Sequence, residues 1–310
     1  MYLVRASPPP SEWGVTVDGA AVHRLAAAWA QKAFPPPGFD YPGLPPWRGS
    51  QWLNFCVLGC SVVACLWPPE GESPWQAHLD GMWLDDAPGL FACFTRRPDL
   101  TLSQFAVFDL EQSSEFFAGP GTLQLVPERG ERLAQVAETL LQSWDGDATN
   151  LAEDAGWDGP ETVRRLVETV PGFRDEADTP FGRLEFNKLA HLCVAMINSR
   201  SPRPMSRLDT FPVYPDYMLP RFLRHRRVLV YDPDLADTID RRRLIPAGST
   251  WELAIRWGTV YAADRLAAHL AAIGNRVSVP SLDYAMWFEA VLGPQAADMG
   301  EHHRTVTLNY

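Results

Sequence analysis

The residues from position 101 onward constrain the fold most, because apolar side chains recur there at helical spacing. Residues 127–144 show a clear apolar stripe behind a proline in the first turn. Residues 249–273 form the longest such segment, which begins with a Ser-Thr pair suited to cap a helix and has Glu252 in its first turn. We therefore predict that the greater part of the chain is helical.

The same spacing predicts helices over 20–33, 103–117, 127–144, 150–156, 160–169, 183–199, 219–227, 249–273 and 280–291. Residues 52–67 and 75–84 are expected to pair as an antiparallel hairpin, and a buried helix is the alternative for the first of them. The final RTVTLNY alternates like a strand. The predicted fold class is mainly α with a small β element. Because no linker marks a boundary, we expect a single domain over residues 1–310.

The composition limits the classes of partner. A net charge of −11 argues against a duplex nucleic-acid partner, because such proteins need a basic face for the phosphates. The most apolar stretch, residues 52–67, is shorter than the ~20 residues of a bilayer span, so we expect no membrane contact. The N-terminus lacks the apolar region of a secretory signal. Five cysteines without a CxxC spacing fit a reducing compartment, which predicts a cytoplasmic protein.

Common cofactor and metal motifs are absent from the sequence. There is no GxGxxG, no GxxxxGK[ST], no HExxH and no GxSxG. Cys56 and Cys60 have i, i+4 spacing, which small core residues explain more readily than a metal site does. The pair His302–His303 is expected to lie on the surface of the tail. We predict no cofactor and no metal, so the chemistry should depend on carboxylates and a lysine.

Two polar residues stand out by their surroundings. Lys188 lies in an apolar helical segment, where a side chain reaching the rim of the core is favoured over a functional one. Asp216 lies between two tyrosines and two prolines just before a predicted helix. Spacing alone favours Asp216 as a helix cap, and the alternative is a carboxylate held rigidly in an aromatic pocket.

Five sequence blocks occur in an order that resembles one known family. They are FNKLAHLCVA (186–195), DYMLPRFLRH (216–225), ELAIRWGTVYAAD (252–264), SLDYAMW (281–287) and HRTVTLNY (303–310). Together they resemble the queuosine 5′-phosphate N-glycosidases, or queuosine-salvage proteins, with their lysine helix, DYRxPQ turn, E-x-x-IRG helix, LDYxLW helix and HR-x-R tail ending in Tyr. Weaker similarities are LNFC (53–56), VPERGERLAQ (126–135) and VPGFRDE (170–176). The resemblance covers nearly the whole chain.

The resemblance implies an enzyme that hydrolyses the N-glycosidic bond of queuosine 5′-monophosphate and releases queuine for salvage into tRNA. It also implies a helical architecture related to that of helix-hairpin-helix DNA glycosylases. In this reading Asp216 matches the catalytic aspartate, which stabilises an oxocarbenium-like ribosyl centre and orients the attacking water. Lys188 matches the pocket lysine, which keeps Asp216 ionised or holds the 5′-phosphate.

The resemblance further implies a set of residues that bind the substrate or support the site. They are Asn54, Phe55, Tyr217, Arg221, Glu252, Arg256, Asp283 and Trp287. Asn54 or Asp283 is expected to hydrogen-bond the base, and Phe55 and Tyr217 to stack on it. For Arg221 and Arg224 an exposed surface position is favoured, and contact with the phosphate is the alternative.

Four positions depart from the family pattern: Gln51, Met218, Arg221 and Trp257 replace an acidic residue, Arg, Gln and Gly. These departures leave an alternative open, an N-glycosidase of the same family with a different nucleotide substrate. A second alternative is a non-catalytic protein that binds a modified nucleotide. The expected partner is in each case a small-molecule nucleotide, and the expected assembly is a monomer.

Overall fold

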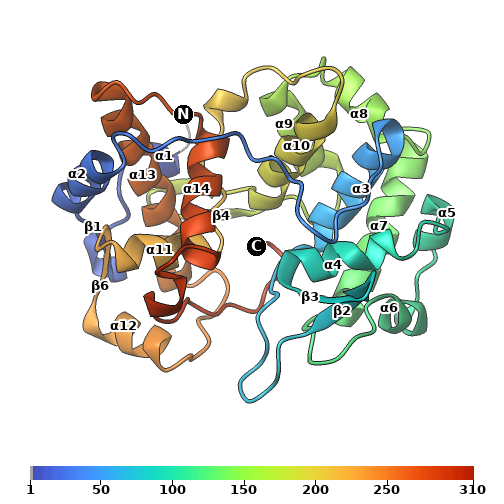
Figure 1. Ribbon diagram of the computed structural model, residues 1–310, viewed down its shortest axis with the longest axis horizontal. Coiled ribbons are helices and arrows are strands. Elements are labelled where there is room, and N and C mark those ends of the chain that lie inside the picture. Colours follow the sequence, from blue (N-terminus) through green and yellow to red (C-terminus); the bar gives the residue numbers. More distant parts are fainter. Residues whose placement is uncertain (1–2) are drawn as a thin grey trace. The chain divides into compact units, whose positions relative to one another are not determined.

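The computed structural model describes residues 3–310, which form fourteen α-helices and three two-stranded antiparallel sheets (Figure 1). The prediction of a mainly α fold with a small β element is confirmed. The chain forms two compact units. Unit 1 contains Asp175–Lys188, Leu208–Val306 and the described residues of Met1–Pro37, and unit 2 contains Gly38–Arg174, Leu189–Arg207 and Thr307–Tyr310. These six segments alternate between the units, and the single domain stays a prediction.

Unit 1 is built around one long helix. Its helices are α1 (Leu3–Ala6), α2 (Gly19–Ala28), α11 (Met218–His225), α12 (Pro233–Asp240), α13 (Thr250–Ala272) and α14 (Val279–Val291), with 3-10 turns η1 (Ser11–Trp13), η2 (Leu208–Thr210) and η3 (Ala296–Asp298). Helix α13 packs against α1, α2, α11 and α14. It is apolar around most of its circumference because it is covered on several sides. Its predicted span of 249–273 is confirmed to within one residue at each end.

Two short sheets complete unit 1. Strand β1 (Val15–Val17) pairs with β6 (Leu229–Tyr231), and both rest on α13 where Gly258 allows a close approach. Strands β4 (Glu176–Thr179) and β5 (Gly182–Glu185) form a hairpin. The predicted helix over 183–199 therefore begins too early, because residues 182–185 belong to that hairpin. The helix itself, α10 (Lys188–Arg200), begins at Lys188, directly after Asn187 with its positive φ of 46°.

Unit 2 is helical with one hairpin. Its elements are α3 (Gly49–Val62), β2 (Gln76–Leu79), β3 (Met82–Asp85), α4 (Asp86–Thr95), α5 (Leu102–Phe105), α6 (Leu110–Phe116), α7 (Val126–Ser143), α8 (Ala148–Asp154), α9 (Gly159–Thr169) and α10 from Leu189. The predicted hairpin between 52–67 and 75–84 is wrong, and the alternative of a buried helix is confirmed for the first segment. Strands β2 and β3 pair with each other instead. The predicted helix over 103–117 is divided into α5 and α6, because each has its own capping box.

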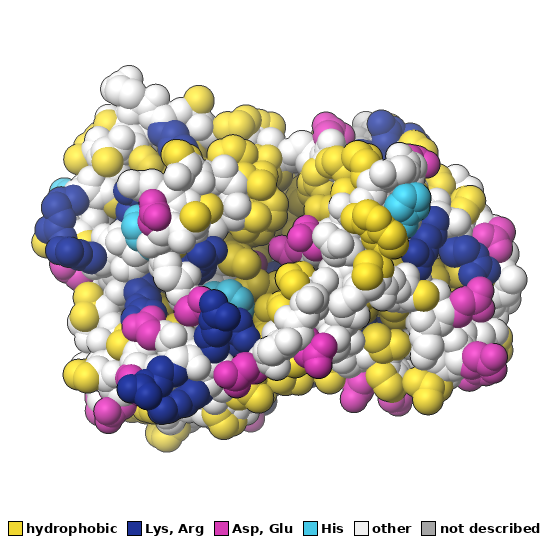
Figure 2. All heavy atoms as spheres, turned by 60° about the horizontal axis from the view of Figure 1, so that its bottom comes forward, with side chains coloured by type: hydrophobic (Ala, Val, Ile, Leu, Met, Phe, Trp, Pro, Cys, Tyr) yellow, Lys and Arg dark blue, Asp and Glu magenta, His cyan; other side chains and the backbone are white. Residues whose placement is uncertain are grey.

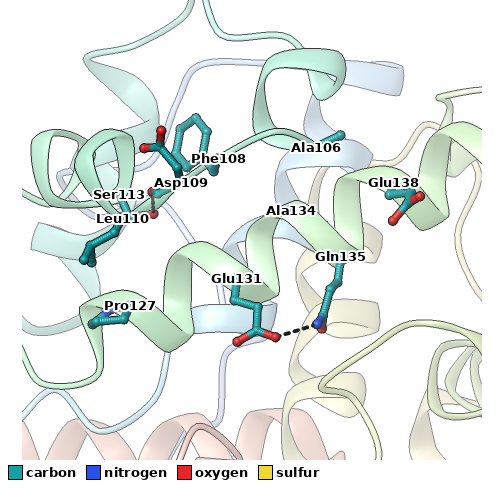
Figure 3. A pocket seen from close by; sticks show the side chains of 10 residues that line it. All are labelled: Ala106, Phe108, Asp109, Leu110, Ser113, Pro127, Glu131, Ala134, Gln135 and Glu138. Carbon is teal, nitrogen blue, oxygen red and sulfur yellow. Dashed lines mark hydrogen bonds between the residues drawn. The ribbon is translucent and has the colours of Figure 1, made fainter.

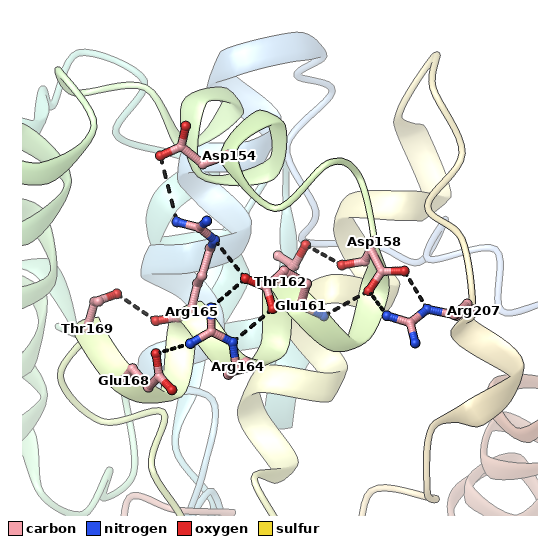
Figure 4. Close-up of polar contacts among 9 residues, drawn as sticks. All are labelled: Asp154, Asp158, Glu161, Thr162, Arg164, Arg165, Glu168, Thr169 and Arg207. Atoms are coloured by element: carbon pink, nitrogen blue, oxygen red, sulfur yellow. Dashed lines mark hydrogen bonds and ion pairs between the residues drawn. The ribbon is translucent and has the colours of Figure 1, made fainter.

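Within unit 2, the start of α9 is joined to Arg207 in the segment that follows α10 (Figure 4). Asp158 caps α9 by accepting a hydrogen bond from the backbone N of Glu161 at 3.0 Å. The same carboxylate accepts a hydrogen bond from Nε of Arg207 at 2.6 Å, and this contact lowers the pKa of Asp158 to about 2. Along the helix Arg164 pairs with both Glu161 and Glu168. These exposed ion pairs contribute little individually.

The C-terminal residues follow an irregular path. Arg304 forms an isolated bridge with Leu244, and residues 305–310 of the described chain contain no strand. The predicted strand over RTVTLNY is therefore wrong. Within residues 3–310, no helix combines the length and the apolar character that crossing a bilayer requires. On the face shown in Figure 2, the described basic side chains form small groups with acidic side chains among them.

Candidate active site

Asp216 lies in unit 1, two residues before the first residue of α11. Its Oδ1 accepts hydrogen bonds from the backbone N of Met218 at 2.7 Å and of Leu219 at 3.0 Å. The side chain therefore binds the first two backbone N–H groups of α11 from one residue ahead of the N-cap position, which Tyr217 occupies. Since both bonds use the same oxygen, capping also fixes the orientation of the carboxyl group. The cap and the rigidly held carboxylate, which were alternatives in the sequence, are compatible in the structure.

Lys188 is the first residue of α10, and only 7% of its surface is exposed. It is one of two lysines in the chain, the other being Lys32. Burial raises the pKa of Asp216, and the positive charge of Lys188 is the largest opposing influence. The sequence favoured a lysine that reaches solvent at the rim of the core, and the burial of Lys188 does not fit that prediction. Instead its charge acts on the carboxyl of Asp216.

Asp283, on α14, supplies a second carboxyl group, which is 8% exposed. Its Oδ1 accepts a hydrogen bond from the backbone N of Tyr214 at 2.7 Å. Burial raises the pKa of Asp283 well above its usual range, the Tyr214 hydrogen bond lowers it, and the charge of Asp216 raises it further. The charge of Lys188 again acts in the opposite direction. The site thus joins two carboxyl groups and one lysine, and the charge of the lysine acts on both carboxyl groups.

A buried ion network underlies these residues. Arg256, in the second turn of α13 and 2% exposed, donates from Nε to the carbonyl of Pro215 at 3.1 Å. Its Nη1 and Nη2 bind the two carboxylate oxygens of Asp175, and Nη1 also contacts Glu252 at 3.2 Å. Glu252 in turn accepts a hydrogen bond from the backbone N of Gly248 at 3.1 Å. Glu252 and Arg256 are therefore placed to support the site.

Sequence reasoning missed Asp175, whose only signal was its position in the weak VPGFRDE block. It also missed the two histidines of the tail, which the structure does not leave on an exposed surface. The ring of His302 packs on Tyr217 with 4.8 Å between centroids, and His303 is 2% exposed. Burial lowers the pKa of His302 to about 4 and that of His303 to about 3. Because Nδ1 of His302 lies 2.7 Å from the carbonyl of His303, that nitrogen carries the proton of the neutral ring.

Arg221 has contacts of another kind. Its guanidinium donates to the backbone carbonyls of Ala290, Ala296 and Gly300, at 3.1, 2.8 and 2.7 Å. These bonds tie α11 to the end of α14 and to the loop that follows. They support a structural role, and the substrate contact of Arg221 stays a prediction. The neighbouring Arg224 forms an exposed ion pair with Asp240.

Trp287 is partly buried on α14 and stacks on Tyr284 with 6.1 Å between ring centroids. Tyr217 is 7% exposed and follows Asp216 directly. Six of the predicted substrate-binding and supporting residues thus belong to unit 1 together with Asp216 and Lys188: Tyr217, Arg221, Glu252, Arg256, Asp283 and Trp287.

Asn54 and Phe55 belong to unit 2. The side-chain amide of Asn54 donates to the carbonyl of Gly146 at 2.9 Å and accepts from the backbone N of Ala148 at 2.7 Å. Phe55 is 2% exposed within a cluster of aromatic rings. Both residues line a hollow of about 260 Å³ together with Gln51, one of the positions that depart from the family pattern. Their contact with the base stays a prediction.

A second hollow in unit 2, of about 270 Å³, lies along α7 and beside α6 (Figure 3). Its acidic side chains already have structural partners. Asp109 caps α6 by binding the backbone N of Gln112, and Glu131 accepts a hydrogen bond from Gln135 one turn later on α7. We assign this hollow no function.

Unit 1 is helical and brings two carboxyl groups together with a buried lysine, and a pair of carboxyl groups is typical of glycosidases. A sequence model described as "Queuosine salvage protein" matches residues 92–310, which is more than half of the chain. The chain belongs to the queuosine salvage protein family, as its motifs predicted.

Three relatives show the extent of the similarity. Each is named queuosine 5′-phosphate N-glycosylase/hydrolase. The protein from Sphaerobacter thermophilus is 27% identical, over 96% of this chain and 93% of its own. The protein from Mus musculus is 25% identical, over 79% of this chain and 82% of its own. The protein from Dictyostelium discoideum is 25% identical, over 59% of this chain and 58% of its own.

Proposed function

We propose that this protein is an N-glycosidase that hydrolyses queuosine 5′-phosphate and releases queuine for salvage into tRNA. Membership of the queuosine salvage family and the names of its relatives support this function. The structural observation that carries it is the carboxyl group of Asp216, which two backbone N–H groups orient and the charge of Lys188 influences.

In the proposed reaction Asp216 acts as the ionised carboxylate. Breaking the bond between the ribose and the base develops positive charge on the ribosyl centre, as in other glycosidases. A carboxylate beside that centre stabilises the charge and orients the attacking water or accepts its proton. Lys188 favours the ionised form of Asp216 because its positive charge lowers the pKa of that carboxyl.

Asp283 has the complementary role. A 7-deazapurine has no N7 that an acid could protonate, so its departure requires hydrogen bonds elsewhere on the base. The high pKa of Asp283 favours the neutral acid, which has an O–H to donate while Oδ1 accepts from Tyr214. We assign this donor role to Asp283. Two carboxyl groups whose surroundings differ can divide the ionised and the protonated roles between them.

The remaining predicted residues have proposed roles in binding or support. Tyr217 directly follows Asp216, and Trp287 comes one helical turn after Asp283. We assign both aromatic side chains to the lining of the site. For Asn54 and Phe55, which belong to unit 2, contact with the base stays a prediction from the family resemblance. Glu252 and Arg256 act as buried supports rather than as ligands.

We propose that the protein acts as a monomer in the cytoplasm. The described cysteines, Cys56, Cys60, Cys65, Cys93 and Cys193, are free and buried, which supports a reducing compartment. A pocket for a single nucleotide needs no second copy of the chain.

The function is tested by incubating purified protein with queuosine 5′-phosphate and following free queuine by mass spectrometry. Asp216→Asn should lose most of the activity while remaining folded. Asp240→Asn, which removes an exposed carboxylate paired with Arg224, is the matched control and should keep it.

Other outcomes would point to the two alternatives. If wild type binds queuosine 5′-phosphate and leaves it intact, the protein is a binding module. If it cleaves a different nucleotide from a panel, the substrate assignment is wrong, and Gln51 and Met218 become the first positions to exchange.

A further inference from the structure

The buried ion pair between Arg256 and Asp175 connects the two chain segments that carry Lys188 and Asp216. Arg256 acts on the second of these segments. Its Nε holds the carbonyl of Pro215, the residue that directly precedes Asp216, at 3.1 Å. Its planar group lies over the ring of Phe186 at 4.0 Å, which fixes the plane in which its donors point.

Asp175 holds the first segment through its backbone. Its carbonyl accepts hydrogen bonds from the backbone N of Phe186 at 2.9 Å and of Asn187 at 3.1 Å. Its own backbone N donates to Oδ1 of Asn187 at 2.9 Å. Asn187 has a positive φ of 46° and directly precedes Lys188, so these bonds fix the direction in which α10 begins.

The carboxylate of Asp175 joins the two halves of this arrangement. It receives both terminal nitrogens of Arg256, the bidentate geometry in which arginine and carboxylate hold one another most rigidly. Asp175 and Arg256 are 5% and 2% exposed, so water does not compete for these bonds to any great extent. A displacement of Asp175 would therefore move the residues before Lys188 and the residue before Asp216 together.

We propose that Asp175 is a positioning residue, which sets the separation of Lys188 and Asp216 without contacting the substrate. This inference rests on the proposed function, because it assigns Asp175 to the reaction of that same site. Asp175 bonds to the residues that precede Lys188 and, through Arg256, to the residue that precedes Asp216. Its effect on catalysis then passes through the charge of Lys188 and the orientation of Asp216.

The test compares Asp175→Asn with Asp264→Asn. The control removes a carboxylate from the same helix as Arg256, where Asp264 pairs with Arg5 at 2.6 Å. With queuosine 5′-phosphate, Asp175→Asn should lower kcat by about 10- to 100-fold with a smaller change in KM, because a 1 Å misplacement can cost about that much. Asp264→Asn should stay within about twofold of wild type.

The pH profile separates positioning from a loss of folded protein. If Lys188 moves away from Asp216, the pKa of Asp216 rises, and the acid limb of kcat/KM should move upward by about one pH unit. If part of the enzyme is only unfolded, the rate falls but the pH of the acid limb of kcat/KM does not change. An unchanged limb and an unchanged kcat in folded Asp175→Asn would overturn the inference.

A second variant covers the case in which Asp175→Asn does not fold. The triple variant Asp175→Asn/Glu252→Gln/Arg256→Gln removes all three charges of the buried network and so leaves none of them unpaired. It should fold and still have the low kcat and the shifted acid limb. Wild-type activity in this triple variant would show that only charge balance matters and would overturn the inference. A wild type that releases no queuine would overturn the proposed function itself, and this inference with it.

Discussion

The backbone N–H of Tyr214 donates a hydrogen bond to Oδ1 of Asp283 over 2.7 Å. This bond ties α14 to the segment that leads into Asp216, and so brings a second carboxyl group into the site. It also leaves the other oxygen of Asp283 as the place for a proton, because Oδ1 is the acceptor. The consequence is that asparagine, which accepts and donates in the same two directions, should replace this side chain well.

Asp283→Asn should therefore keep activity within about tenfold of wild type, whereas Asp216→Asn should not. Steady-state rates of queuine release from the two variants measure this difference. If Asp283→Asn is as inactive as Asp216→Asn, then Asp283 acts in its ionised form and the division of roles is wrong.

The difference in stability between wild type and Asp283→Asn should change with pH in a defined direction. A pKa raised in the folded state means that wild type loses stability as pH rises from the usual aspartate range toward the raised pKa. Asparagine has no such loss. The Tm of the variant relative to wild type should thus increase between pH 5 and pH 8, at about 2–4 °C for each kcal/mol. A Tm difference that does not change with pH would contradict the buried, proton-binding state of Asp283.

Lys188→Gln should shift the pH dependence of catalysis. Without the positive charge the pKa of Asp216 rises, so the acid limb of kcat/KM should move to higher pH by about one unit. Lys32→Gln is the matched control, since it removes the other lysine, which pairs with Glu289 at 2.8 Å in the same unit. The idea fails if the two variants have the same acid limb.

The helices with an amphipathic stripe or a clear cap could be predicted from the sequence, and α13 is the best example. Helix α3 could not be distinguished from a strand, because ten of its fourteen residues are buried and no polar face reveals its period. The hairpin of β4 and β5 was missed for a related reason. Its strands have four residues each, and only Phe186 and Asn187 separate β5 from α10.

The residues of the candidate site could be predicted from family resemblance but not from their spacing in the sequence. Family resemblance indicated Asp216, Lys188 and Asp283, whereas spacing alone favoured a cap for the first and the rim of the core for the second. Asp175 could not be found from spacing, because its partner Arg256 lies 81 residues away and only the tertiary fold joins them. The burial of His303 depends on packing that the pattern of a short tail does not encode.

His302→Gln should make the protein less sensitive to acid. The pKa of His302 is lowered to about 4 in the folded state. Below about pH 6.5 the unfolded chain therefore binds a proton at this residue that the folded protein does not bind. As the pH falls from 6.5 to 4, the unfolding free energy of wild type should therefore decrease more steeply than that of the variant. The difference between the two slopes should be at most about 1.4 kcal/mol per pH unit. Urea unfolding at pH 7, 6 and 5 measures both slopes. Parallel slopes would show that His302 titrates normally.

Arg221→Ala should lower stability rather than substrate affinity. The side chain donates to three backbone carbonyls, and hydrogen bonds of charged groups contribute about 1.5–3 kcal/mol each when buried and less where they are partly exposed. Thermal unfolding and KM for queuosine 5′-phosphate distinguish the two roles. An unchanged Tm with a KM raised about tenfold would instead establish the predicted contact with the substrate.

The central claim is that Asp216 drives hydrolysis of the N-glycosidic bond of queuosine 5′-phosphate. The most direct measurement is a single-turnover reaction in ¹⁸O-labelled water, with queuine and ribose 5-phosphate followed by mass spectrometry for wild type and Asp216→Asn. We expect wild type to release queuine together with ribose 5-phosphate that carries one ¹⁸O, and folded Asp216→Asn to be slower by at least about 100-fold. Equal rates for the two proteins would contradict the account.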